Sequence, residues 1–369
     1  MEIIGNKWMP EMGCHNIKNT LPTSMKKRLL LFFFLCISLL CLLNGWPRGF
    51  QAINRSTFIG WNNSANVTIL LWHWPFGRSF SLKGDVCWDL YHIPHCRLVD
   101  QRSLYPTADV VVFHNRELVL GLQKLPFDLP RPQGQRWAWM SLEAPVHSGN
   151  LRQFANIFNL TMTYRRDADI PIPYGELQPK KAEGGPVDDI PLNKSFLVCW
   201  VVSNYRSHYR RSKVYNELST IVPVEVYGAW TKKPLPSTAL LSTISRCYFY
   251  LAFENSMTKD YITEKLWRNA YQGGAVPVVL GPPPSGYKAV APPNSFIHVD
   301  EFASLRDLGK YLQQLAEDKK RYSEYFNWKQ EWSVKLYTDW RERLCKICPQ
   351  YKSLPQQRVY SDLEAWVNS

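Results

Sequence analysis

The sequence predicts an α/β protein made of two domains, each with a doubly wound parallel sheet. Three observations support this fold class. The chain has 369 residues, for which two domains are the natural expectation. Short apolar runs typical of buried strands alternate with polar or helical segments along most of it. The segment Cys247–Pro283 reads as strand, loop, helix and strand in order, which implies a parallel pair with a right-handed crossover.

The N-terminal part predicts a membrane anchor. Residues 1–28 are polar and end in Lys26, Lys27 and Arg28, and an uninterrupted apolar run of 15 residues follows at 29–43. With the interfacial end up to Trp46, we interpret 29–46 as a signal-anchor helix, short enough for a thin Golgi membrane. The basic flank places the N-terminus in the cytosol and the rest in the lumen, a single-pass type II arrangement. A cleaved signal peptide is the alternative, but no A-x-A pattern follows the run.

A stem and several glycosylation sequons follow the anchor. Residues 47–66 show no hydrophobic period and are expected to link the anchor to the folded part. Five N-x-S/T sequons in a lumenal chain favour N-glycosylation. They begin at Asn54, Asn62, Asn66, Asn159 and Asn193.

The first folded domain is expected at 67–180. Helical or loop segments separate three apolar strand-like runs, an arrangement typical of an α/β domain. The polar stretch KKAEGGPVDDIP, from Lys180 to Pro191, predicts a surface loop between this domain and the next. The three strands are expected at 67–73, 108–114 and 136–142.

The second domain is expected at 181–320 and repeats one theme. A basic helix at 208–218 follows its first strand, and further strands alternate with helices, which predicts a parallel sheet. The remainder, 321–369, is rich in Trp and Tyr and ends in a helical DLEAWVNS. The strands of this domain are expected at 196–202, 224–227, 248–253, 275–280 and 296–299.

Polar residues in the Cys247–Pro283 unit predict a ligand site. Its helix is expected from Asp260, with an apolar face formed by Ile262, Leu266 and Ala270, and to end at Gly273–Gly274. Ligands bind beyond the carboxyl ends of strands in such sheets, and a helix N-terminus attracts phosphate.

Two charged residues of this unit suit a nucleotide-sugar. Lys265 adds a positive charge for the phosphates, and Glu264 can accept hydrogen bonds from sugar hydroxyls. The alternative is that this Glu-Lys pair only forms a solvated face of the helix.

A long motif in this unit resembles a known family. The segment FENSMTKDYITEKLWRNAYQGGAVPVVLGPP is similar to the donor-binding signature of the α-(1,3)-fucosyltransferases. The similarity extends from Val67 to the C-terminus through WHWPFG, RSLY, YRRDAD, CWVVSN and DWRERLCKIC. The last of these, with VYSDLEAW, most resembles the sialyl-Lewis-x-forming type. The resemblance implies a GT-B-like fold, in which two Rossmann-type domains face a cleft and the 321–369 tail packs on the first domain.

The resemblance also implies an activity. The family moves L-fucose from GDP-fucose, with inversion, in α1,3 linkage to GlcNAc, without an obligatory metal or other cofactor. The acceptor expected here is sialylated type 2 lactosamine on glycoproteins and glycolipids, to which the net charge of +13 is suited. No nucleic-acid motif is visible, so nucleic acid is not an expected partner. The alternatives are a non-catalytic lumenal glycan-binding protein on the same scaffold, and a metal-dependent transferase using the DxD triplet of Asp167 and Asp169.

The family's functional residues match positions of this chain. Glu143, just after a predicted strand, matches the general base, which removes the proton of the acceptor hydroxyl; a purely structural carboxylate is the alternative. The acceptor motif matches at His114, Arg116 and Glu117, although Asn115 stands where the family has His. Arg116 implies a type 2 acceptor, and a loop Arg paired with Glu117 is the alternative. Donor contacts are implied at Ser203, Asn204, Arg211, Tyr250, Asn255, Tyr261, Glu264 and Lys265.

The cysteines predict disulfides. Of the nine cysteines, three lie in the tail or anchor. The six that remain are an even number in an oxidising compartment, which favours disulfide bonds between them. Cys199 and Cys247 lie on central strands of the second domain, and the resemblance pairs them. The other four allow three connectivities, and two local bridges or a zinc site are alternatives. By resemblance, the favoured pairs are Cys87–Cys345 and Cys96–Cys348.

Overall fold

The computed structural model describes residues 66–180 and 194–369. The predicted cytoplasmic tail and anchor lie outside these ranges, as do the stem up to residue 65 and the sequons at Asn54, Asn62 and Asn193. In the ranges that the structure describes, no helix is long and apolar enough to cross a bilayer.

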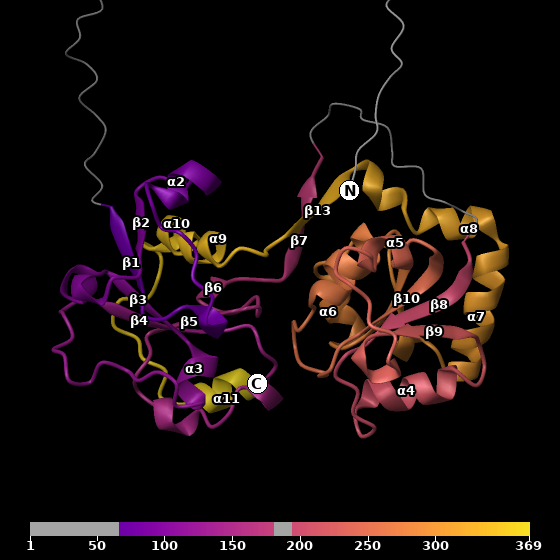
Figure 1. Cartoon of the computed structure of the whole chain (residues 1–369), viewed down its shortest axis with the longest axis horizontal. Helices are drawn as coiled ribbons and strands as arrows, with labels where there is room; N and C mark the ends of the chain where they lie inside the picture. The colour runs from indigo at the N-terminus through magenta and orange to yellow at the C-terminus, as the bar shows by residue number, and fades with distance from the viewer. Residues whose placement is uncertain (1–65, 181–193) are drawn as a thin grey trace, which may run out of the picture. The chain divides into compact units, whose positions relative to one another are not determined.

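The first domain is built on a six-stranded parallel sheet of order β2-β1-β3-β4-β5-β6, shown in indigo and magenta in Figure 1. The three strands predicted from the sequence are β1, β3 and β4, each slightly shorter than expected. The other three strands are too short to leave a clear apolar pattern. The strands are β1 (Val67–Leu71), β2 (Cys96–Val99), β3 (Val110–His114), β4 (Arg136–Ser141), β5 (Leu160–Thr163) and β6 (Ile170–Pro171).

Both faces of this sheet are buried. Alternate residues of β3 enter two different cores: Val110 and Val112 face one, and Val111 and Phe113 face the other. The C-terminal helices complete both cores, with Leu344 in the first and Leu363 in the second. The helices of this domain are α2 (Val86–Tyr91), α3 (Asn115–Val119), α9 (Trp340–Cys345), α10 (Ile347–Gln350) and α11 (Leu363–Asn368). Figure 1 shows the yellow helices α9 and α10 beside the indigo strands and α11 beside α3.

The second domain contains a five-stranded parallel sheet of order β12-β11-β10-β8-β9. All five strands predicted for it are present. They are β8 (Phe196–Val201), β9 (Val224–Tyr227), β10 (Cys247–Phe253), β11 (Val276–Leu280) and β12 (Ile297–His298). The α-helices are α4 (Arg210–Leu218), α5 (Leu240–Ile244), α6 (Pro284–Lys288), α7 (Leu305–Glu317) and α8 (Lys319–Glu324).

The helix of the donor motif differs from the prediction. It begins at Lys265 rather than Asp260 and is a π-helix, η6 (Lys265–Gln272). Asp260 has a left-handed backbone with φ of 58°, which a helix cannot include. The three residues of the expected apolar face are buried, but only Leu266 and Ala270 lie on the helix, and Ile262 precedes it.

The C-terminal tail is shared between the two domains. Helix α8 and the side chains of Tyr322 and Phe326 belong to the core of the second domain, so the tail does not leave that domain at residue 321. The chain crosses back through β13 (Trp332–Leu336), which pairs antiparallel with β7 (Gly175–Pro179). The helices from α9 onward pack in the cores of the first domain.

Three disulfides are present, and they are the ones that the resemblance implied. They join Cys199 to Cys247, Cys87 to Cys345 and Cys96 to Cys348. The first connects neighbouring strands of the second sheet, and the other two tie the C-terminal helices to the first domain. A zinc site built from these cysteines is therefore wrong, because their sulfur atoms bond to each other.

Candidate active site

A cavity of about 380 Å³ gathers candidate residues from both domains. Glu143 and His114 reach it from the carboxyl ends of β4 and β3, and Glu264 reaches it from the donor motif. The segment that leads from β13 into α9 closes another side. The complete lining is Phe76, His114, Leu142, Glu143, Tyr174, Glu264, Arg268, Leu336, Tyr337, Thr338, Trp340 and Arg343.

Glu143 is held in place by its backbone, while its carboxylate is available. Its backbone N–H donates to the Ser141 hydroxyl at 3.2 Å, and the preceding carbonyl of Leu142 accepts from the Tyr174 hydroxyl at 2.7 Å. The side chain is half-buried. Among the residues that the structure describes, none forms a hydrogen bond or ion pair with the Glu143 carboxylate. A group that is fixed but unpaired at a cavity wall suits proton transfer.

The acceptor motif forms a buried polar cluster next to the cavity. His114 Nδ1 lies 2.5 Å from Glu117 Oε2, and the other carboxylate oxygen of Glu117 accepts from the Phe76 N–H at 2.9 Å. Burial opposes ionisation of Glu117, but the hydrogen bond and charge of His114 lower its pKa to about 2. His73 adds a bond to the His114 carbonyl at 3.0 Å. His114 and Glu117 therefore fix the shape of this wall.

Arg116 is the exposed member of that motif. Its side chain is 43% exposed, 3.5 Å from Glu117 and 5.2 Å from the Phe76 ring. Asn115, where the sequence departs from the family pattern, is buried: its amide donates to the Ser148 carbonyl and accepts from the Trp139 indole, both at 2.9 Å. The pair with Glu117, the alternative reading of Arg116, is therefore formed, but Arg116 is also the exposed member of the motif, whereas Asn115 has a structural role.

The donor motif is organised around a buried carboxylate, Glu254. Its oxygens accept hydrogen bonds from the Thr263 backbone N–H at 2.8 Å and from Lys265 Nζ at 2.9 Å. Lys265 Nζ also donates to the Thr263 hydroxyl at 2.7 Å and approaches Glu264 at 3.3 Å. Glu254 is 1% exposed. The predicted donor residues Glu264 and Lys265 are therefore positioned by Glu254, whose fixing role the sequence did not reveal.

The charges of this cluster are coupled. Burial raises the pKa of Glu254, while the Lys265 ammonium opposes the shift. Burial likewise disfavours the charged form of Lys265, but Glu254 and Glu264 raise its pKa. For Glu264, burial acts against ionisation and Lys265 outweighs it, so that the pKa is lowered. Lys265 therefore remains cationic, and Glu264 anionic, at neutral pH.

Arg211 lies close to the same carboxylate. It is 5% exposed at the start of α4, its guanidinium donates to the Asn204 carbonyl, and its buried Nε has no partner among the described residues. Burial lowers its pKa, and the charge of Glu254 partly opposes this. Ser203 and Asn204 are exposed in the loop after β8. The structure thus brings Arg211 and Lys265 to one end of the second sheet, as predicted for a phosphate site.

Three other donor candidates are less accessible than expected. Tyr250 is fully buried in the core, and its hydroxyl accepts from Asn269 at 3.0 Å. Tyr261 is 4% exposed and packs between Tyr164 and Tyr174 of the first domain. The side-chain amide of Asn255 lies 3.4 Å from His147. The ring of Tyr250 is enclosed by the surrounding core, and the Tyr250 hydroxyl is bonded to Asn269.

Comparisons with known proteins place the chain in a family. Residues 191–366 match the model "Glycosyltransferase family 10 (fucosyltransferase) C-term", and residues 64–175 match "Fucosyltransferase, N-terminal". Alpha-(1,3)-fucosyltransferase 7 of Rattus norvegicus is 48% identical over 301 residues, which cover 81% of this chain and 79% of the relative. The 4-galactosyl-N-acetylglucosaminide 3-alpha-L-fucosyltransferase 9 of Bos taurus is 43% identical, with 81% and 82% covered.

The chain belongs to glycosyltransferase family 10. It is therefore an enzyme of the glycosyltransferase class. A solved structure of an alpha1,3-fucosyltransferase with GDP-fucose has the same fold, at 19% identity and a TM-score of 0.51, covering 81% of this chain and 93% of that one. The GT-B-like arrangement of two α/β domains expected from the sequence is confirmed.

The DxD triplet of this family 10 enzyme is engaged in ion pairs. Asp167 accepts from Arg165 at 2.8 Å and from Lys259 at 2.9 Å. Asp169 accepts from the Thr161 N–H at 2.9 Å, from the Tyr360 hydroxyl at 2.8 Å and from Arg358. The guanidinium of Arg165 and the Lys259 ammonium keep the pKa of Asp167 below its usual range. Both carboxylates of the triplet are therefore engaged by protein groups in this structure, Asp167 by Arg165 and Lys259 and Asp169 by Thr161, Arg358 and Tyr360.

The two sequons within the described ranges differ in exposure. Asn66 is exposed just before β1. Asn159 is 6% exposed, its amide donates to the Arg358 carbonyl at 2.8 Å, and its oxygen accepts from the Trp137 N–H at 2.9 Å. A glycan on Asn159 is not compatible with this fold, because its amide nitrogen is enclosed and hydrogen-bonded.

Several cavity residues of this enzyme escaped the sequence analysis. Trp340 and Arg343 belong to the C-terminal DWRERLC segment, and Arg268 lies on η6. Arg343 is buried and donates to three backbone carbonyls, those of Ile172 and Pro173, both at 2.8 Å, and that of Tyr337. The signal that identifies DWRERLC is its own Cys345 and the nearby Cys348, since their disulfides tie the segment to the first domain.

Proposed function

We propose that this enzyme transfers L-fucose from GDP-fucose, with inversion, in α1,3 linkage to the GlcNAc of sialylated type 2 lactosamine. One observation carries the proposal: a single cavity holds the unpaired carboxylate of Glu143 together with Glu264 of the donor motif. The reaction needs a base on the acceptor side and a held sugar on the donor side, and this cavity supplies both. The relatives named above support the donor and the linkage.

The donor is held by the second domain in this proposal. Lys265 and Arg211 supply the positive charge that stabilises the departing diphosphate, a task that a metal performs in other transferases. The contact between Lys265 and Glu264 is the longest that the ammonium makes to a carboxylate, at 3.3 Å. An arriving phosphate replaces that contact first, which frees Glu264 to accept a hydrogen bond from a fucose hydroxyl.

The acceptor is activated by Glu143. Its carboxylate takes the proton of the GlcNAc hydroxyl as the oxygen attacks the anomeric carbon of fucose, and the bond to the phosphate oxygen breaks. Attack from the face opposite the leaving group inverts the anomeric centre, from β in GDP-fucose to α in the product. The proton of the acceptor hydroxyl is then on Glu143, and the leaving group departs as GDP.

The sialylated acceptor is expected to meet Arg268. Of the two cavity arginines, Arg343 is 4% exposed and donates to three backbone carbonyls, whereas Arg268 makes one long hydrogen bond within the described part of the chain, to the Ser237 carbonyl at 3.5 Å. Its guanidinium has donors to spare for a carboxylate such as that of sialic acid. The name of the Bos taurus relative, a 4-galactosyl-N-acetylglucosaminide fucosyltransferase, supports the type 2 core, as does the exposed Arg116.

The predicted location completes the proposal. The apolar run at 29–46, its basic flank and the three disulfides favour a Golgi enzyme anchored as a single-pass type II membrane protein, with the catalytic part in the oxidising lumen.

One assay tests the donor, the acceptor and the linkage together. The full-length chain in detergent is incubated with labelled GDP-fucose and either sialylated or neutral N-acetyllactosamine, and the product is analysed by glycosidase digestion and NMR. We expect α1,3-fucosylated product and faster transfer to the sialylated acceptor. Arg268→Gln should reduce the preference for the sialylated acceptor while transfer to the neutral one continues. Equal or faster transfer to the neutral acceptor by the wild type contradicts the specificity, and no transfer to either contradicts the proposed function.

A further inference from the structure

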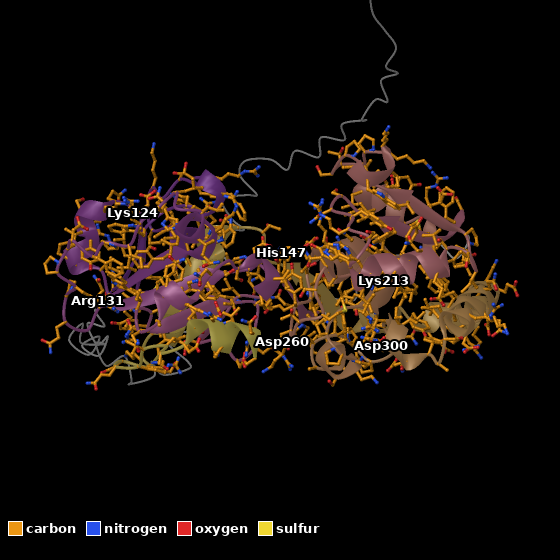
Figure 2. All side chains as sticks on the ribbon, turned by 90° about the horizontal axis from the view of Figure 1, so that it is seen from below. Lys124, Arg131, His147, Lys213, Asp260 and Asp300 are labelled. Carbon is orange, nitrogen blue, oxygen red and sulfur yellow. A yellow bond between two sulfur atoms is a disulfide. The ribbon has the colours of Figure 1, made fainter. Side chains whose placement is uncertain are left out.

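The donor motif is attached to the first domain through the residues that precede Glu264. Asp260 (labelled in Figure 2) accepts two hydrogen bonds from Arg166, one from Nε at 2.9 Å and one from the backbone N–H at 3.1 Å. The next residue, Tyr261, is part of the core of the first domain, where its ring centroid lies 5.0 Å from that of Tyr164. Lys259 pairs with Asp167 at 2.9 Å. Three consecutive residues of the donor motif are therefore fixed by the other domain.

The backbone of Asp260 sets the direction of the chain toward the site. Its φ of 58° is in the left-handed region, which is unfavourable for a residue with a side chain, although Asp tolerates it better than most. Such a conformation persists where the surroundings fix it. Here Arg166 holds the side chain, and the Asp260 carbonyl accepts from the Ile262 N–H at 2.9 Å. The Thr263 N–H then bonds to Glu254.

The segment that carries Glu264 and Lys265 thus has two anchors. One is Glu254, within the second domain, and the other is Arg166, on the first. Arg166 is absent from the lining of the 380 Å³ cavity, so it acts on the donor through Asp260. It is also 51% exposed, while Asp260 is 4% exposed, which means that Arg166 can be replaced without emptying a core.

We propose that Arg166 is a positioning residue for the donor. Its ion pair with Asp260 holds the Tyr261–Lys265 segment in the geometry that binds the nucleotide diphosphate, and so the acceptor-side domain controls donor affinity. The inference rests on the proposed function, because the nucleotide considered is GDP. It assigns to the YRRD segment a role that neither metal binding nor acceptor recognition describes.

The test compares two variants of the full-length chain in detergent. Arg166→Gln removes the charge, and Arg166→Lys retains it. Arg152→Gln is the matched control, because Arg152 forms an exposed ion pair with Glu364 at 2.9 Å, away from the donor motif. The readouts are GDP affinity by calorimetry, KM for GDP-fucose, kcat and Tm.

We expect Arg166→Gln to weaken GDP binding and to raise the donor KM by roughly 10-fold, an effect of the size that misplacement of a binding group produces. The acceptor KM and the Tm of this variant should both stay near the values of Arg152→Gln. Arg166→Lys should restore part of the GDP affinity. Asp260→Asn should have the same effect as Arg166→Gln, and the double variant should be no worse than either single one, since both remove one interaction.

Two results overturn the proposal. One is GDP affinity in Arg166→Gln equal to that of Arg152→Gln. The other is a loss of GDP affinity in Arg166→Gln that comes with a matching fall in Tm and that Arg166→Lys does not restore, which indicates a merely structural role. Calorimetry separates this failure from failure of the proposed function: if the wild type binds no GDP, the proposed function itself is wrong.

Discussion

Replacing Lys265 by Ala should destabilise the enzyme more strongly than the loss of an ordinary surface charge. Lys265 is 17% exposed and its partner Glu254 is 1% exposed, so the variant leaves a carboxylate buried without its cation. Removing one partner of a buried pair costs about 3–5 kcal/mol. Because Thr263 still donates to Glu254, we expect the low end, about 3 kcal/mol. For a domain of this size that is a Tm lower by about 6–12 °C.

The pH dependence of this loss has a definite sign. Without Lys265, burial and the charge of Glu264 keep the pKa of Glu254 above the value of about 4.3 for an unfolded chain, and the hydrogen bond from the Thr263 N–H opposes them only in part. Below that pH the carboxyl group is neutral in both states and burial costs little. As the pH rises, the unfolded state loses its proton first and becomes relatively more stable. The Tm deficit of Lys265→Ala should therefore be larger at pH 7.5 than at pH 5.

The assay is thermal unfolding of the full-length chain in detergent, followed by tryptophan fluorescence at both pH values. Lys288→Ala is the control, because Lys288 pairs with Glu301 at 2.7 Å on the surface of the same domain, where the two side chains are 63% and 40% exposed. Such pairs contribute at most about 1 kcal/mol. Equal Tm shifts for the two variants at pH 7.5 would refute the reasoning.

Three further predictions concern other parts of the molecule. Glu117→Gln should lower Tm at pH 7. Since the pKa of Glu117 is lowered to about 2, the stability that its carboxylate contributes is present above about pH 4.3 and is lost as the pH falls toward 2. The Tm difference between the variant and the wild type should therefore close over that range, and a constant difference would contradict this. Replacing both Cys199 and Cys247 by Ala, which opens a loop of sequence separation 48, should cost about 4 kcal/mol in unfolding experiments, and mass mapping that finds these two as free thiols in active enzyme would disprove the pairing. EDTA should leave turnover within about two-fold of the untreated enzyme, because protein cations stabilise the leaving group. A complete loss of turnover that Mn²⁺ restores would instead support a metal site at Asp167 and Asp169.

Local patterns were sufficient to predict most of the sheets. Strands such as β10 and β11 are continuous apolar runs buried on both faces, and their own composition identifies them. The disulfides and Glu143 were found through similarity to a family, since neither leaves a local signature. Edge strands such as β6, with 2 residues, are too short for any periodicity.

The errors arise where distant residues decide the local structure. The helix of the donor motif starts late because Arg166, 94 residues away, holds Asp260 in a non-helical conformation. The sequon at Asn159 is a valid motif, but Arg358 encloses it from 199 residues away. Tyr250 fits an aromatic donor contact by type, yet its position on β10 directs it into the core.

The central claim is that Glu143 is the general base of the fucosyl transfer. The most direct measurement is the turnover of Glu143→Gln, together with its GDP affinity by calorimetry, in the full-length chain. Gln keeps the size of the side chain but has no basic oxygen, so turnover should fall by roughly 10²–10⁴-fold. GDP affinity should change little, because the nucleotide is held by Lys265 and Arg211 of the other domain. Turnover above about a tenth of the wild-type value, short of the low end of that range, would mean that the base is another residue.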